Sequence, residues 1–165
     1  MALFLSDIGW PDVEEYLHHD DRLILVIGST EQHGRHLTFS TDVWQPWDIA
    51  RRAGDRTGVL IAPPVNYGMS LHHLGFPGSL SLQPQTLSAI VSDLLASAYR
   101  HGFRRILIVN GHGGNVPAIQ VALAEVLNEL PHAALESLQL ERANAQAKEL
   151  QATARLVLFY SEETP

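Results

Sequence analysis

Two carboxylates and two histidines stand where they could share a metal ion. Glu31 and His33 follow an apolar run at residues 22–28, in a polar stretch that ends at Asp42, and His112 lies in a second glycine-rich stretch, NGHGGN. Residues two apart in an extended segment project to the same side, so Glu31 and His33 can face one point. Nitrogen and oxygen ligands without thiolate favour zinc, manganese or a related first-row ion over calcium.

Such a site is suited to hydrolysis. A carboxylate such as Asp42 can bridge two ions, and water between them becomes hydroxide near neutral pH while the metals polarise a scissile carbonyl. Each residue alone has a structural interpretation, since Glu31 could cap a helix and His33 could be a polar residue at a turn. NGHGGN could also cradle a phosphate, but it lacks the lysine of a P-loop. We favour a metal site, because otherwise the E-x-H spacing, the following Asp42 and the glycine-flanked His112 would all have to occur together by chance.

The two histidine-bearing stretches are expected to meet because each follows a predicted strand. Apolar runs predict strands at 22–28, 59–63 and 104–111, and helical spacing predicts helices at 43–53, 84–101 and 115–130, the first ended by Gly54. In the C-terminal tail we expect a strand at 133–140, a helix at 141–154 and a strand at 155–161. This alternation predicts an α/β fold with a mostly parallel sheet, whose ligands bind beyond the carboxyl ends of the strands.

Composition narrows the class of protein. A chain of 165 residues with 45% apolar and 18% charged residues is expected to form one domain, residues 1–165. Its formal charge of −7 disfavours nucleic acid or an anionic membrane as the main partner. The chain has no cysteine, which excludes disulfides and cysteine nucleophiles. The start, MALFLSDIGW, lacks a basic segment and no apolar run is long enough to span a membrane, so we expect a cytoplasmic protein.

Three stretches in the same order, GSTEQHGRHLTFSTD, SLHHLGFPGSLSL and RRILIVNGHGGN, resemble the creatininase family of metal-dependent amidohydrolases. The resemblance covers about residues 5–130 and implies a three-layer α/β sandwich that assembles as a homo-oligomer, often a hexamer. It implies that Glu31, His33, Asp42 and His112 bind two ions of zinc, manganese or iron. Asp42 would bridge the ions, and Glu31 and Asp42 would serve catalysis.

The resemblance also indicates residues that line the substrate site. His36 and His73 match histidines of the family, and we expect them, with Gly113 and Gly114, to contact substrate. The implied reaction is hydrolysis of a C–N bond in a small-molecule amide: a cyclic amide, a formamide or a small peptide-like compound.

The chain departs from the family pattern at one ligand. Creatininase itself has a carboxylate ligand two residues after the NGH histidine, where this sequence has Gly114. Relatives with NGHGGN take that carboxylate from a downstream segment that has no clear counterpart here, and only Glu162 and Glu163 resemble it faintly. The family's downstream histidine has none either, because the one histidine after position 112 is His132, in a Pro-His turn.

One ion position is therefore expected to be strong and the other weak. Glu31, Asp42 and His112 complete the first and leave a place for water. His33 and Asp42 are too few for tight binding at the second unless Glu162, Glu163 or a neighbouring subunit contributes. The alternative from another class is a catalytically impaired metal-binding or assembly protein derived from this family.

Overall fold

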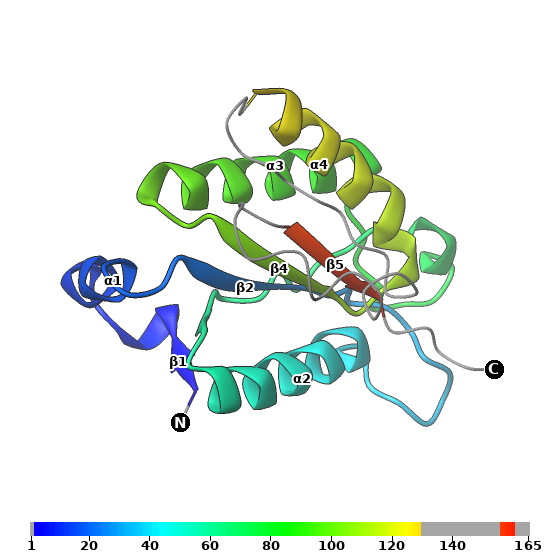
Figure 1. Cartoon of the computed structure of the whole chain (residues 1–165). Coiled ribbons are helices and arrows are strands. Elements are labelled where there is room, and N and C mark those ends of the chain that lie inside the picture. Colours follow the sequence, from blue (N-terminus) through cyan, green and yellow to red (C-terminus); the bar gives the residue numbers. More distant parts are fainter. Residues whose placement is uncertain (1, 130–155, 161–165) are drawn as a thin grey trace, which may run out of the picture.

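A computed structural model describes residues 2–129 and 156–160 of the chain (Figure 1). The strands are β1 Leu3–Phe4, β2 Arg22–Ile27, β3 Leu60–Ile61, β4 Arg105–Asn110 and β5 Leu156–Tyr160. The helices are α1 Trp10–Leu17, α2 Thr41–Thr57, α3 Pro84–His101 and α4 Val116–Glu129. Three short 3-10 turns accompany them: η1 Leu5–Asp7, η2 Leu71–His73 and η3 Gly113–Asn115.

The strands form one sheet in the order β1-β3-β2-β4-β5, and every pairing between these described strands is parallel. Figure 1 shows α2 on one face of the sheet and α3 and α4 on the other. The predicted α/β fold, a mostly parallel sheet flanked by helices in three layers, is confirmed.

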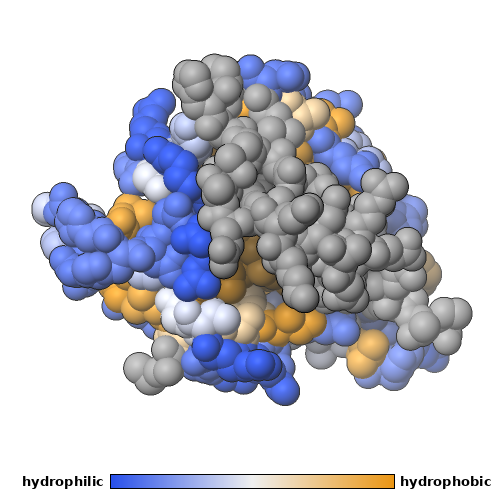
Figure 2. All heavy atoms as spheres, in the orientation of Figure 1, coloured by the Kyte–Doolittle hydropathy of each residue, from blue (hydrophilic) through white to orange (hydrophobic). Residues whose placement is uncertain are grey.

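Strand β2 is central and has both faces buried, which explains why it reads as an unbroken apolar run. Leu23, Leu25 and Ile27 belong to the core cluster that includes residues of α3 and α4, whereas Ile24 and Val26 belong to the cluster that includes Ala50 of α2. Figure 2 shows hydrophilic residues over α1 and the C-terminal part of α2, with hydrophobic residues between them.

Most predicted helices and strands are confirmed with small changes at their ends. The predicted end of helix α2 is wrong. Helix α2 continues through Gly54 to Thr57 and ends at Gly58, which has a φ of 69°. Gly54 serves packing instead, because a Cβ there would lie 2.7 Å from Cδ1 of Ile61.

Several other elements lie outside the sequence predictions or outside the described residues. Strand β1 and helix α1 were not predicted, and β3 is shorter than the run at 59–63. The final strand is confirmed by β5, whereas the predicted strand at 133–140 and helix at 141–154 lie outside the described residues. Among the described helices, none is both long and apolar enough to cross a membrane.

Two glycines at the strand ends bring the start of α2 against the sheet. Gly28 follows β2 and Gly111 follows β4, and these strands are hydrogen-bonded neighbours. A Cβ at Gly28 would lie 2.6 Å from the carbonyl oxygen of Asp42, and one at Gly111 would overlap that oxygen and lie 2.5 Å from Cγ of Pro46. The position of Asp42 therefore depends on the absence of side chains at both strand ends.

We expect Gly111→Ala to destabilise the protein by about 1–3 kcal/mol, as overpacking of a close contact does. The start of α2 would have to move away from β4, which would also displace Asp42. The matched control is Gly75→Ala, because a Cβ at Gly75 meets no atom within 4 Å and its φ is not positive. The free energy of unfolding in urea tests this expectation, and equal values for both variants would contradict it.

Candidate metal centre

Two loops and the first turn of a helix place acidic and histidine side chains together beyond the carboxyl ends of β2 and β4. Glu31 follows β2, Asp42 lies in the first turn of α2 and His112 follows β4. All three are buried, with 5%, 2% and 6% of their surface exposed. The predicted meeting of the two histidine-bearing stretches is therefore what the structure shows.

The contacts among these side chains join both carboxylates to one imidazole. Nδ1 of His112 lies 3.2 Å from Oε1 of Glu31 and 3.0 Å from Oδ2 of Asp42. Nε2 of His33 lies 2.8 Å from Oδ1 of Asp42. Ligand atoms of Glu31, Asp42 and His112 all lie within 4.8 Å of one another, close enough to hold one metal ion.

The backbone fixes the ring nitrogens of both histidines. Nε2 of His112 donates to the carbonyl oxygen of Met69 at 3.0 Å, and Nδ1 of His33 donates to the carbonyl oxygen of Glu31 at 3.1 Å. A carbonyl only accepts, so these nitrogens carry hydrogen and the other nitrogen of each ring faces the carboxylates. Metal-ligating histidines are commonly held in this way.

Two buried carboxylate oxygens have no hydrogen-bond partner among the described residues. These are Oε2 of Glu31 and Oδ2 of Asp42, the second of which lies 3.0 Å from Nδ1 of His112. Buried charged oxygens are normally paired or coordinate metals. The donor set and these oxygens therefore fit a divalent cation.

The pKa values of His112 and Glu31 in the metal-free site indicate that the site favours a positive charge. Burial opposes a charged His112, but contacts with Asp42 and Glu31 outweigh it and raise the pKa of His112 to about 10. Burial likewise opposes a charged Glu31, yet contacts with His112 and Ser70 lower its pKa to about 2. Without an ion, an imidazolium at His112 supplies the missing cation.

Two buried asparagines hold these loops together. Asn115 accepts the amide hydrogen of Met69 at 2.8 Å and donates to the carbonyl of Gly28 at 3.0 Å. Asn110 donates to the carbonyl of His112 at 2.7 Å. Ser70, also fully buried, hydrogen-bonds to Ser29. Sequence reasoning missed these positioning residues, although both asparagines flank the glycines of NGHGGN.

The remaining site residues from the sequence fall into two groups. His73 lies at the site, with Nε2 3.6 Å from Oε1 of Glu31. His36 is exposed, and in the described part of the chain it belongs to neither group of side chains that could hold a metal ion. Gly113 and Gly114 form the turn η3 beside His112.

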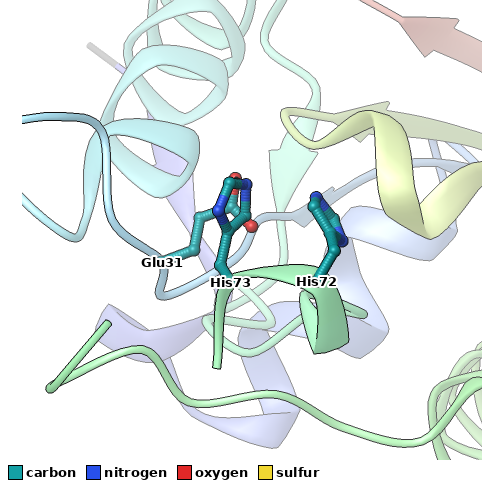
Figure 3. A group of neighbouring side chains, drawn as sticks. All are labelled: Glu31, His72 and His73. Carbon is teal, nitrogen blue, oxygen red and sulfur yellow. The ribbon is translucent and has the colours of Figure 1, made fainter. Parts of the chain in front are cut away.

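His72 is the functional candidate that sequence reasoning did not assign. Glu31, His72 and His73 form a second group whose ligand atoms lie within 4.8 Å of one another. Figure 3 shows both histidines rising from one turn, with His73 next to the Glu31 carboxylate. The signal that could have found His72 is the adjacent histidine pair in a long loop rich in glycine and proline.

Gly114 has a packing role that explains why it carries no side chain. A Cβ there would overlap both Nε2 of His112 and the carbonyl oxygen of Met69. A carboxylate at this position would therefore require the loop to shift. Glu162 and Glu163, the other candidates for that ligand, lie outside the described residues.

The sequence is similar to those of known hydrolases. The chain is 31% identical over 145 residues to creatinine amidohydrolase of Pseudomonas putida, covering 84% of this chain and 56% of that protein. It is 38% identical over 128 residues to mycofactocin precursor peptide peptidase of Mycolicibacterium smegmatis, covering 73% and 51%. The chain thus spans about half the length of these curated relatives.

Solved structures give the same result. A manganese creatininase superposes with a TM-score of 0.80 at 28% identity, covering 97% of this chain and 58% of that one. A Zn–Zn form of a creatininase mutant is also similar, with a TM-score of 0.77 and the same identity and coverage. The family model described as creatininase, creatinine amidohydrolase, matches residues 6–158. The chain belongs to the creatininase family.

Proposed function

We propose that this chain is a metal-dependent amidohydrolase that cleaves a C–N bond with water, at a site formed by Glu31, Asp42 and His112. The observation that carries the proposal is the convergence of two buried carboxylates on one imidazole whose other nitrogen is held by a backbone carbonyl. A zinc or manganese ion bound there supplies a Lewis acid and lowers the pKa of water toward neutrality.

The protein's own residues have distinct tasks in this proposal. Glu31 and Asp42 balance the charge of the cation in a buried environment, where their carboxylates keep it from exchanging freely. The Met69 carbonyl orients His112, and the Glu31 carbonyl orients His33 toward Asp42. His73, half-buried beside Glu31, faces the same space and is placed to contact a bound amide.

The names of two relatives indicate the range of substrates to consider. One is named for a cyclic amide, creatinine, and another for a peptide. A small amide, either cyclic, formyl or peptide-like, is therefore the substrate class that we propose, for one domain that acts in the cytoplasm as a homo-oligomer.

Replacing Asp42 with asparagine keeps the shape of the side chain and removes its charge. We expect Asp42→Asn to lower kcat/KM for the best amide substrate by at least about 100-fold, since changes around metal ligands alone cost ten- to a hundredfold. A panel of creatinine, formamide-type compounds and short peptides, with added zinc or manganese, provides the assay.

The matched control is Asp48→Asn, the same change on an exposed turn of the same helix, where Asp48 pairs with Arg51 and Arg52. It should leave activity unchanged. Hydrolysis that survives in Asp42→Asn would remove this site from the mechanism. A wild-type protein that binds metal but hydrolyses no amide would instead favour a metal-binding or assembly protein.

We expect the affinity of the tight site for zinc to rise with pH. Since His112 has a pKa of about 10 in the metal-free site, it is protonated at neutral pH and must release that proton to become a ligand. Glu31, with a pKa of about 2, is already ionised and releases none. The zinc affinity of the tight site should therefore rise roughly tenfold per pH unit across neutral pH.

Calorimetry in buffers of different ionisation enthalpy measures this proton directly. We expect at least one proton released per tightly bound zinc between pH 6.5 and 8.5, about the range below the pKa of His112. An affinity independent of pH would show that His112 is not a ligand. A chain with His112→Gln should lose the tight ion.

A further inference from the structure

A cleft of about 500 Å³ lies beside the metal centre and contains none of the proposed metal ligands. Its aromatic walls are Trp44 and Trp47 of helix α2 and Tyr67 of the loop that follows β3. Trp44 and Tyr67 are exposed over 64% and 48% of their surface, although tryptophan is on average among the more buried residues. Exposed aromatic residues that share one cleft, rather than lying singly, indicate a binding surface.

The cleft adjoins the metal centre because the same two segments of chain form both. Thr30 lines the cleft and Glu31 follows it in an extended segment, where consecutive side chains point to opposite sides. Val43 lines the cleft and Asp42 precedes it in the first turn of α2. A molecule with its amide at the metal can therefore extend past these segments and place a further group in the cleft.

Hydrogen bonds hold one wall of the cleft against the end of β2. The backbone amide of Val65 donates to the carbonyl oxygen of Val26 at 2.9 Å. The Thr30 hydroxyl donates to the carbonyl oxygen of Asn66 at 2.8 Å, which fixes the segment that carries Tyr67. This wall is formed before a ligand arrives, so binding costs little conformational entropy there.

Packing holds the opposite wall, on helix α2. Val43 lies against the end of β2, where a Cβ at Gly28 would come within 2.7 Å of Cγ2 of Val43. Trp47 stacks on Phe4, with ring centroids 5.3 Å apart, so contact with β1 holds its ring. Trp44 is more exposed than any of these and presents its ring to a ligand.

The residues of the cleft select the chemistry of its ligand. None of the described residues that line the cleft is charged, so an ionic group bound there would lose its water shell without gaining an opposite charge. The rings of Trp44 and Tyr67 favour a flat ring, which can stack on them or meet them edge-to-face. Ser40 and Asn66 also line the cleft and offer a hydroxyl and an amide to polar atoms of that ligand.

We propose that the cleft lined by Trp44 and Tyr67 binds an uncharged, planar ring of the substrate, separate from the amide that is cleaved. This rests on the proposed function and narrows its substrate class to amides that carry such a ring at a distance from the scissile bond. The ring contributes binding energy and the metal centre performs the cleavage, so the cleft should affect KM more than kcat.

Hydrolysis of matched peptides by the full chain, with added zinc or manganese, tests the proposal. The substrates are glycine peptides in which one residue at a time is replaced with phenylalanine, leucine or lysine. We expect phenylalanine at one position to raise kcat/KM at least about tenfold over glycine, mainly through KM, because an aromatic side chain becomes buried. Leucine should gain less and lysine nothing. A preference for lysine over phenylalanine, or equal rates for all peptides, would contradict the proposal.

Variants of the cleft should remove the preference for phenylalanine. In Trp44→Ala and Tyr67→Ala the ratio of kcat/KM between the phenylalanine and glycine peptides should fall to within about threefold of one. Tyr67→Phe keeps the ring and should retain the preference. The matched control is Trp10→Ala, because Trp10 is 77% exposed at the start of α1 and does not line this cleft. A ratio that stays high in both alanine variants overturns the proposal.

Binding can also be measured without hydrolysis, by tryptophan fluorescence. The probe is N-acetylphenylalaninamide, which is uncharged and does not emit in the tryptophan range. We expect a saturable change in emission with the wild type, and none with N-acetylglycinamide. Tyr67→Ala keeps Trp44 as the reporter and should weaken binding at least about threefold, whereas Trp10→Ala should bind like the wild type. No binding by the wild type, or unchanged binding by Tyr67→Ala, would count against the cleft.

Other outcomes separate this proposal from a subunit contact and from the proposed function. If Trp44→Ala dissociates an oligomer in analytical ultracentrifugation but leaves the phenylalanine preference unchanged, the cleft is a contact between copies of this chain and the proposal is wrong. If Asp42→Asn abolishes hydrolysis and phenylalanine gives no gain, only the cleft is misassigned. If Asp42→Asn hydrolyses normally while the preference depends on Trp44, the cleft stands and the proposed metal mechanism fails.

Discussion

Two buried carboxylates that share one imidazole set the constraint around which the loops of the site are arranged. Glu31 and Asp42 both approach Nδ1 of His112, and each has one oxygen without a hydrogen-bond partner in the described part of the chain. Two negative charges this close in a buried place need a cation between them. A protonated His112 can satisfy that need in part, whereas a divalent ion satisfies it more fully and uses the unpaired oxygens. The loops around the site are built to maintain this demand for positive charge.

The parallel sheet is what brings these groups together. Strands β2 and β4 are paired in register, so their carboxyl ends deliver Glu31 and His112 to one edge. Gly28 and Gly111 then let the start of α2 approach closely enough to add Asp42. Asn115 ties the loop of Met69 to the end of β2. The positions of these side chains are therefore tied to the sheet, because Glu31 and His112 follow buried strands and Asp42 lies in a turn packed against their ends.

The sequence predicted the parts that follow from local pattern. Apolar runs located β2 and β4, and their glycine-rich ends indicated that Glu31, His33 and His112 would converge. Pairings that depend on three dimensions were not predictable. Nothing local indicates that Gly54 packs on Ile61 rather than ending α2. The adjacent histidines of η2 are visible in the sequence, but no local pattern shows that they approach Glu31, which is distant along the chain. Strand β1 was not recognised, whereas the equally short β3 was, because β3 lies within the predicted apolar run at 59–63.

The absence of a carboxylate at position 114 is connected with the orientation of His112. A side chain at this position would overlap Nε2 of His112 and the Met69 carbonyl, the donor and acceptor of the bond that fixes the His112 ring. With this backbone, a carboxylate at position 114 and that hydrogen bond exclude one another. The chain therefore keeps a well-oriented His112 in place of a side chain at position 114. The turn η2, which follows Met69 and Ser70 directly, is anchored by the same contacts, and these place His73 beside Glu31.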